Sequence, residues 1–243
     1  MNRRPLLSRL TLLTALSFSL HQAASALPPV RILAWDDQVA TRRLALASGS
    51  EVVEIAGLHP SKRGKPIKLA GSEEKLFIRA LDKPPVDGKP VQRAFSISAT
   101  VGNPLVILLP DPSDPTGIRA MTIDDDPKGF SWGSYRFLNA TSQEIVVQLE
   151  KTARPVPPGW KPVELLPGGA TRGIPAMFGT AGRMNKPVYS AVWEFDPGVR
   201  TLCFLVPGTD PGRSPIAVKA IPEERKTVAR EAAADAESGQ GGN

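Results

Sequence analysis

The segment 94–110, AFSISATVGNPLVILLP, returns in related form at 191–207 as AVWEFDPGVRTLCFLVP. The two segments align without a gap at an offset of 97 residues. Each combines an alternating stretch, a turn and an apolar run. Alternation of apolar and polar residues is typical of a β-strand with one buried face. The aligned pair therefore predicts two β modules of the same kind in tandem.

Two further pairs of segments extend the alignment. Residues 65–69 (KPIKL) match 161–165 (KPVEL) at an offset of 96, and residues 30–33 (VRIL) match 135–138 (YRFL) at an offset of 105. Because the segments keep their order and nearly their spacing, we interpret the chain as an internal duplication.

The rest of the chain has the same character. Short runs rich in Val, Ile, Leu and Phe are separated by turns that hold most of the 25 prolines and 21 glycines. Helical segments of the length that βαβ crossovers need are missing. The pattern of residues 37–46 fits either a short helix or a strand. We predict an all-β fold of tandem antiparallel β-sandwich-like modules, Ig-like in general architecture. The alternative is one pseudo-symmetric β-sandwich whose halves share a core.

The first 26 residues have the layout of a cleavable signal peptide. Arg3 and Arg4 give a basic start, residues 10–20 are apolar but too short to span a bilayer, and small residues lead up to Ala26. We therefore expect export to the periplasm or the exterior. The pattern favours the Sec route over the twin-arginine route, which the paired arginines would also fit.

The predicted domain organisation follows from these features. After the signal peptide (1–26) come β-sandwich module 1 (27–128) and β-sandwich module 2 (129–221). Residues 222–243 are rich in Glu, Ala and Gly, so we expect a disordered or partly helical tail.

Composition argues against several classes of function. Without the signal peptide the chain has 27 basic and 24 acidic residues, a net charge of +3, and no basic run interleaved with aromatics. This predicts no nucleic-acid partner. Cys203 is the single cysteine and His59 the single histidine beyond residue 26, so we expect no disulfide, no multi-histidine metal site and no cofactor. No transmembrane segment is expected after cleavage.

A basic loop is the first candidate ligand site. His59, Lys62, Arg63 and Lys65 follow a predicted strand, and such a loop suits a carboxylate, a phosphate or a sulfated sugar. The alternative is a solvated loop whose charges keep the protein soluble.

Aromatic and acidic residues provide the other candidates. Trp132 and Trp160 lie in Gly/Pro-rich loops, where they could stack on sugar rings or cap the ends of the modules. Asp124, Asp125 and Asp126 offer oxygen ligands to Ca²⁺, but adjacent residues of an extended chain point to alternating sides, so we predict no metal site.

These patterns favour an exported, non-catalytic binding or scaffolding protein of the cell envelope. It would act through loops or edges of its β-sandwiches, and its partner would be an envelope protein or a glycan. One alternative is a hydrolase of an envelope or extracellular polysaccharide, using carboxylates such as Glu194 and Asp196 beside Trp193. A second alternative is a small-anion binding protein that uses the basic loop.

Overall fold

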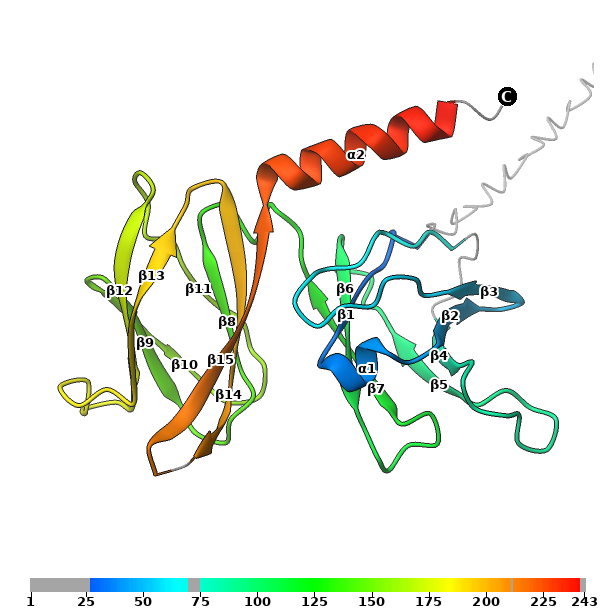
Figure 1. Ribbon diagram of the computed structural model, residues 1–243, viewed down its shortest axis with the longest axis horizontal. Helices are drawn as coiled ribbons and strands as arrows, with labels where there is room; N and C mark the ends of the chain where they lie inside the picture. The colour runs from blue at the N-terminus through cyan, green and yellow to red at the C-terminus, as the bar shows by residue number, and fades with distance from the viewer. Residues whose placement is uncertain (1–26, 70–74, 211, 241–243) are drawn as a thin grey trace, which may run out of the picture.

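The computed structural model describes residues 27–69, 75–210 and 212–240. Strands predominate strongly over helices among the described residues, which confirms the predicted all-β class. The described strands form four sheets, none of them closed into a barrel, and the sheets stack as successive layers (Figure 1). The predicted signal peptide, residues 1–26, lies outside the described residues.

The first group of elements is called module 1. Its described elements are β1 (Arg31–Ala34), α1 (Asp37–Ala40), β2 (Leu44–Ser48), β3 (Glu51–Glu54), β4 (Lys75–Ala80), β5 (Gln92–Ser96), β6 (Pro104–Pro110) and β7 (Ile118–Asp124). They form a three-stranded sheet, β1-β6-β7, and a four-stranded sheet, β3-β2-β4-β5. The segment 37–46 is divided between α1, which Asp36 caps by accepting from the Val39 amide, and β2.

The second group is called module 2. Its described strands are β8 (Tyr135–Asn139), β9 (Ile145–Leu149), β10 (Thr152–Val156), β11 (Val163–Leu165), β12 (Arg172–Gly179), β13 (Tyr189–Phe195), β14 (Val199–Asp210) and β15 (Ser214–Glu224). They form the sheets β11-β8-β14-β15 and β10-β9-β12-β13.

The two modules pair their strands in the same order. In module 1, β1 is parallel to β6 and β6 is antiparallel to β7, while β8, β14 and β15 repeat this pattern in module 2. Arg31 lies opposite Leu105, and Arg136 lies opposite Leu202, so the register reproduces the sequence offsets of 105 and 97. The duplication itself remains a prediction.

The gapless alignment at 97 does not hold along its whole length. Phe95 of β5 and Trp193 of β13 both pack against the core of their own module, and they are 98 residues apart. Because side chains alternate between the two faces of a strand, an offset of 97 there would align an inward residue with an outward one. The stretch from Phe95 to Leu105 is therefore one residue longer than the corresponding stretch from Trp193 to Leu202.

The apolar runs of β6 and β14 are explained by burial on both faces. Val106 and Leu108 of β6 point into the core of module 1, whereas Cys203 and Leu205 of β14 point into the core of module 2. The intervening residues meet between the modules in a third cluster, called here the interface core. Its buried members are Leu33, Leu105, Ile107, Leu109, Phe130, Leu138, Leu202, Phe204 and Ile221.

The interface core joins the modules firmly. A fully buried Leu, Ile or Phe side chain contributes roughly 1.5–3 kcal/mol to stability through the hydrophobic effect. The nine buried residues of the interface core therefore hold the modules together more strongly than polar contacts along an exposed linker would. The two modules thus have separate cores and a shared interface, and they pack side by side (Figure 1).

After β15 the chain continues into the helix α2 (Arg225–Gln240), which leaves module 2 and extends over the top of module 1 (Figure 1). Most of its described side chains are exposed. Neither of the described helices is long and apolar enough to cross a membrane.

Candidate functional site

The side chains of the predicted basic loop do not all face the same way in the structure. Its backbone follows the free side of β1, because the Ala34 amide donates to the His59 carbonyl and the Gly64 amide donates to the Ile32 carbonyl. His59, Lys62 and Lys65 remain at least partly exposed, but the side chain of Arg63 turns inward and is 1% exposed.

Arg63 enters a buried charge cluster. Its Nε donates to Asp125 Oδ2 at 2.9 Å, its Nη2 to Asp125 Oδ1 at 3.2 Å, and its Nη1 to the Ile221 carbonyl at 3.2 Å. All three nitrogens of the guanidinium therefore have partners within the protein. This bidentate geometry fixes Arg63 between β15 and Asp125, which lies in the linker directly after β7.

The cluster contains three arginines and two carboxylates, namely Arg31, Arg63, Arg200, Asp125 and Glu223. Arg200 Nε donates to Glu223 Oε2 at 2.7 Å, and Arg200 Nη2 lies 3.2 Å from Asp125 Oδ2. Arg31 Nη2 lies 2.6 Å from Glu223 Oε1 as an ion pair, although no donor among the described residues is aligned with that oxygen for a hydrogen bond. The cluster draws on both modules and contacts the interface core, because Arg200 donates to the Phe130 carbonyl and Arg63 to the Ile221 carbonyl.

The arginines determine the charge state of Glu223. Burial alone would raise the pKa of this carboxyl, but Arg63, Arg31 and Arg200 outweigh burial and hold the pKa below its ordinary value. Glu223 is therefore a carboxylate at neutral pH. Because the guanidinium groups are occupied by the protein's own acids, the cluster serves to hold the modules together.

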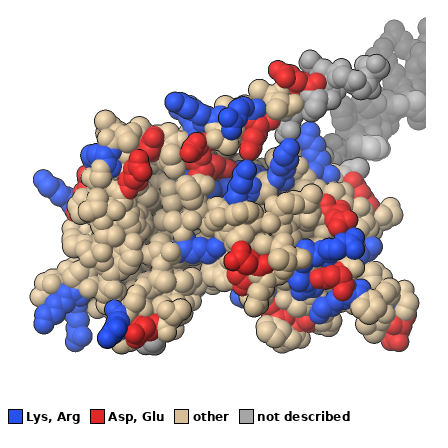
Figure 2. Space-filling model, in the orientation of Figure 1, with Lys and Arg blue, Asp and Glu red and all other residues tan. Residues whose placement is uncertain are grey.

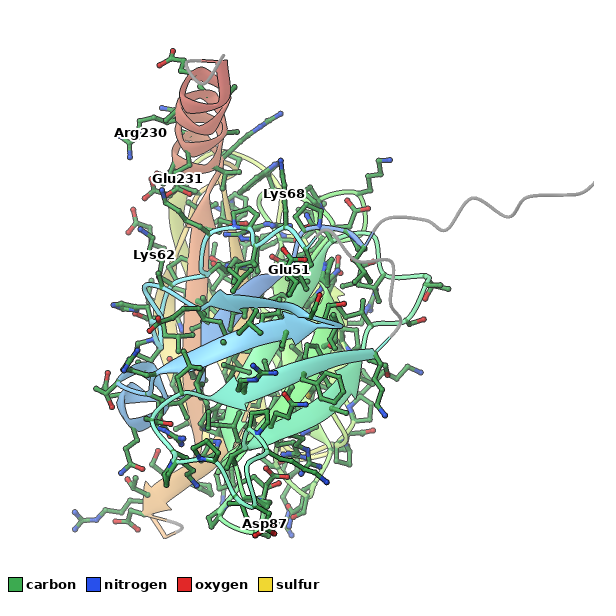
Figure 3. All side chains as sticks on the ribbon, turned by 90° about the vertical axis from the view of Figure 1, so that its right-hand side faces the viewer. Glu51, Lys62, Lys68, Asp87, Arg230 and Glu231 are labelled. Atoms are coloured by element: carbon green, nitrogen blue, oxygen red, sulfur yellow. The ribbon has the colours of Figure 1, made fainter. Side chains whose placement is uncertain are left out.

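A pocket of about 350 Å³ lies above this cluster, between the basic loop, the end of β15 and the start of α2. His59 and Lys62 border it from module 1, and Glu231 borders it from the helix. Lys62 Nζ lies 4.0 Å from Glu231 Oε1, and Figure 3 shows Lys62 beneath α2. The pocket contains cations and carboxylates side by side, so its charge selects neither an anion nor a cation.

Both predicted tryptophans lie at the junction of the modules. The ring of Trp160 is 5.7 Å from that of Trp35 and 5.8 Å from that of Phe204, and its backbone adopts a left-handed φ of 67°. Trp132 lies under the guanidinium of Arg200 at 5.0 Å. Each ring is half-buried and already stacked against protein groups, which fits a packing role.

The three consecutive aspartates point to different partners. Asp125 enters the buried cluster, whereas Asp124 accepts from the Asn103 and Asp126 amides and Asp126 accepts from the Lys128 amide. Among the described residues, no group of three or more His, Cys, Asp or Glu side chains is arranged to hold a metal ion.

The carboxylates of the hydrolase alternative border a pocket of about 300 Å³. Glu194 and Asp196 line it together with Glu224 and Tyr135. Burial is the main cause that raises the pKa of Tyr135 to about 12, so its hydroxyl stays protonated and donates to the Glu194 carbonyl at 2.8 Å. The Tyr135 proton is therefore engaged in a structural hydrogen bond.

The free side of β13, called here the open edge, is a feature that no sequence pattern marks. Unpaired strand edges are usually protected by charged side chains, lysine above all, by proline or by shortness. Among the described edge strands of five or more residues, β13 is the one that contains no Pro, Lys or Arg, since β5, β7, β10 and β15 each contain at least one, and its one charged residue is Glu194 near its end. Val192 at its centre is 76% exposed, more than any other large apolar side chain among the described residues.

The backbone of Val192 faces away from β12. The carbonyl of Pro175, which lies opposite Val192, accepts from the Glu150 amide on the other side of β12. A residue's N–H and C=O point to the same side of an antiparallel strand, so Val192 and Pro175 are a non-hydrogen-bonded pair. The Glu194 carbonyl, two residues further along β13, points to the same side as that of Val192, and it accepts from the Tyr135 hydroxyl rather than from β12. The N–H and C=O of Val192 are thus directed into the open edge.

The surface beside the open edge is poor in charge. On the outward face of the same sheet, Val192 is next to Pro175, and Met177 lies between Ser190 and Gln148. Figure 2 shows a largely uncharged area in the middle of module 2, whereas charged side chains gather over module 1. The open edge therefore combines unpaired backbone groups with an apolar side chain, the two features that an added strand needs.

Comparison with known proteins gives no assignment. No protein-family model matches the sequence, and no curated protein matches it either.

Proposed function

We propose that this chain is an exported, non-catalytic binding protein of the cell envelope that recruits a partner protein to the open edge of β13. The observation that carries the proposal is the unprotected edge itself, with Val192 76% exposed at its centre. An extended segment of a partner can add to such an edge as a further strand, so that main-chain hydrogen bonds give affinity and side-chain contacts give specificity.

The remainder of the chain suits a rigid platform. The interface core and the buried charge cluster fix the two modules to each other, so the open edge is presented in a constant orientation relative to module 1. A protein partner is favoured over a glycan because the unpaired groups at the edge are backbone N–H and C=O groups, which a peptide backbone matches in register.

Site-specific photo-crosslinking in cells that produce the full chain tests this proposal. A photoreactive residue at position 192 is expected to give a defined crosslinked product. The same residue at Val52 or Leu166, which are 42% and 62% exposed, should give little. These controls are exposed apolar residues like Val192 but lie elsewhere on the surface.

A second arm tests whether the backbone edge is responsible. With the photoreactive residue at Ser190, the substitution Val192→Pro should abolish the product, because proline removes the N–H that faces the open edge. Equal products at positions 192, 52 and 166, or none at position 192, would contradict the proposed function.

A further inference from the structure

The open edge has a sequence that is complementary to itself. Val192 is the middle residue of β13, so two copies of the strand that align over their full length in antiparallel fashion place Val192 opposite Val192. In the same register Ser190 lies opposite Glu194 of the other copy. No like charges face each other, and the most exposed apolar side chains on the two strands meet.

The flanking charges are complementary in this arrangement too. The loop before β13 contains Arg183 and Lys186, which are exposed, whereas the strand ends near Glu194 and Asp196. Antiparallel pairing brings the basic loop before one strand, which contains Lys186, to the side of the acidic end of the other strand. A two-fold axis makes each of these contacts twice.

The backbone phase permits the pairing. The N–H and C=O of Val192 face the open edge, so two copies of Val192 can exchange both ladder hydrogen bonds. The Glu194 carbonyl already accepts from Tyr135, but a carbonyl oxygen has two lone pairs and can accept a second bond.

We infer that the occupant of the open edge is a second copy of this chain, joined through antiparallel β13–β13 pairing centred on Val192. The inference rests on the proposed function, because it names the partner at the same edge. A single strand pair buries less than the roughly 1,200–2,000 Å² of stable interfaces, so the dimer is expected to dissociate on dilution.

Disulfide trapping with Val192→Cys tests the pairing directly. The natural Cys203 is buried, so the introduced thiol at position 192 would be the one accessible thiol among the described residues. Directly opposite residues of an antiparallel pair have Cα atoms about 5.5 Å apart, within the range that a disulfide spans. Under mild oxidation we expect Val192→Cys to form a covalent dimer at least about tenfold faster than Val52→Cys, the matched control on edge strand β3.

Sedimentation equilibrium of the purified full chain provides the second measurement. We expect a concentration-dependent dimer that Val192→Pro and Val192→Lys both abolish while thermal unfolding shows that each variant is folded. Lys186→Glu should weaken dimerisation about fivefold or more, and Lys161→Glu, an exposed lysine outside the edge, should leave it unchanged.

The outcomes separate this inference from the proposed function. A chain that stays monomeric at all concentrations, or a dimer that Val192→Pro does not affect, would overturn the β13–β13 pairing. If position 192 still crosslinks to a different envelope protein in cells, the proposed function stands without self-pairing. If position 192 crosslinks to nothing, both fail.

Discussion

Arg31 of β1 and Glu223 of β15 form a largely buried ion pair in which Nη2 and Oε1 are 2.6 Å apart, linking the first strand of module 1 to the last strand of module 2. Asp125, in the linker after β7, binds Arg63 and Arg200 beside this pair. The cluster therefore connects segments that are far apart in the sequence.

Removing one member of this cluster should be costly. Asp125→Ala leaves Arg63 and Arg200 buried without their shared carboxylate, and such a loss typically costs about 3–5 kcal/mol. Urea unfolding is expected to show a fall of this size in the free energy of unfolding. Asp82→Ala, which breaks the more exposed pair with Arg42, is the control and should cost about 1 kcal/mol or less. Equal effects of the two substitutions would show that the cluster does not hold the fold.

The same cluster predicts a pH dependence. The pKa of Glu223 is lowered in the folded chain, so the folded state binds fewer protons than the unfolded state in acid, and stability falls as pH falls. The contribution of Glu223 is present above the ordinary carboxyl pKa of 4.5 and disappears as pH drops through the lower, folded-state pKa. The stability difference between wild type and Glu223→Gln should shrink as pH is lowered from about 6 to 3. A constant difference over this range would contradict the assignment.

The interface core should dominate the coupling between the modules. Phe204 is fully buried there and contacts the rings of Trp35 and Trp160. Phe204→Ala should destabilise the chain by about 3–5 kcal/mol and broaden or split its calorimetric transition, because each module retains its own core. Phe95→Ala, in the half-buried edge of the module 1 core, is a control that should not split the transition. A single sharp transition in Phe204→Ala would argue that the modules do not unfold separately.

Cys203 should be unreactive in the native state. The thiol is fully buried, and this burial raises its pKa far above the ordinary value, so the reactive thiolate does not form at a pH of about 8. Labelling with a thiol reagent is expected to occur only after denaturant unfolds the chain. Rapid labelling of the native chain would contradict this and show that β14 opens to expose the thiol.

Several elements were predictable because their side chains alternate or form apolar runs. The strand at β4, whose Leu76, Ile78 and Ala80 face the core, is of this kind. β10 has no such pattern, because this edge strand is mostly exposed and contains Pro155. The parallel pairing of β1 with β6 was missed, since alternation shows which face is buried but not which strands are neighbours.

The candidate site was less accessible to sequence reasoning for a physical reason. Arg63 lies among His59, Lys62 and Lys65 in the sequence, yet it alone turns inward, because it pairs with Asp125. This partner is 62 residues away, so no local sequence pattern indicates the pairing. Trp160 occupies a Gly/Pro-rich loop but packs between the modules. The open edge depends on the position of β13 in its sheet, and a sequence pattern does not contain that position.

Amide hydrogen exchange at Val192, resolved by residue in the purified chain, tests the open edge most directly. We expect the Val192 amide to exchange rapidly in dilute solution while the neighbouring Trp193 amide, which faces β12, is protected. Val192 should become protected when the partner is bound or the concentration is raised to the dimer range. A Val192 amide that is protected in the dilute chain, or one whose exchange does not change when the partner binds, would contradict the account.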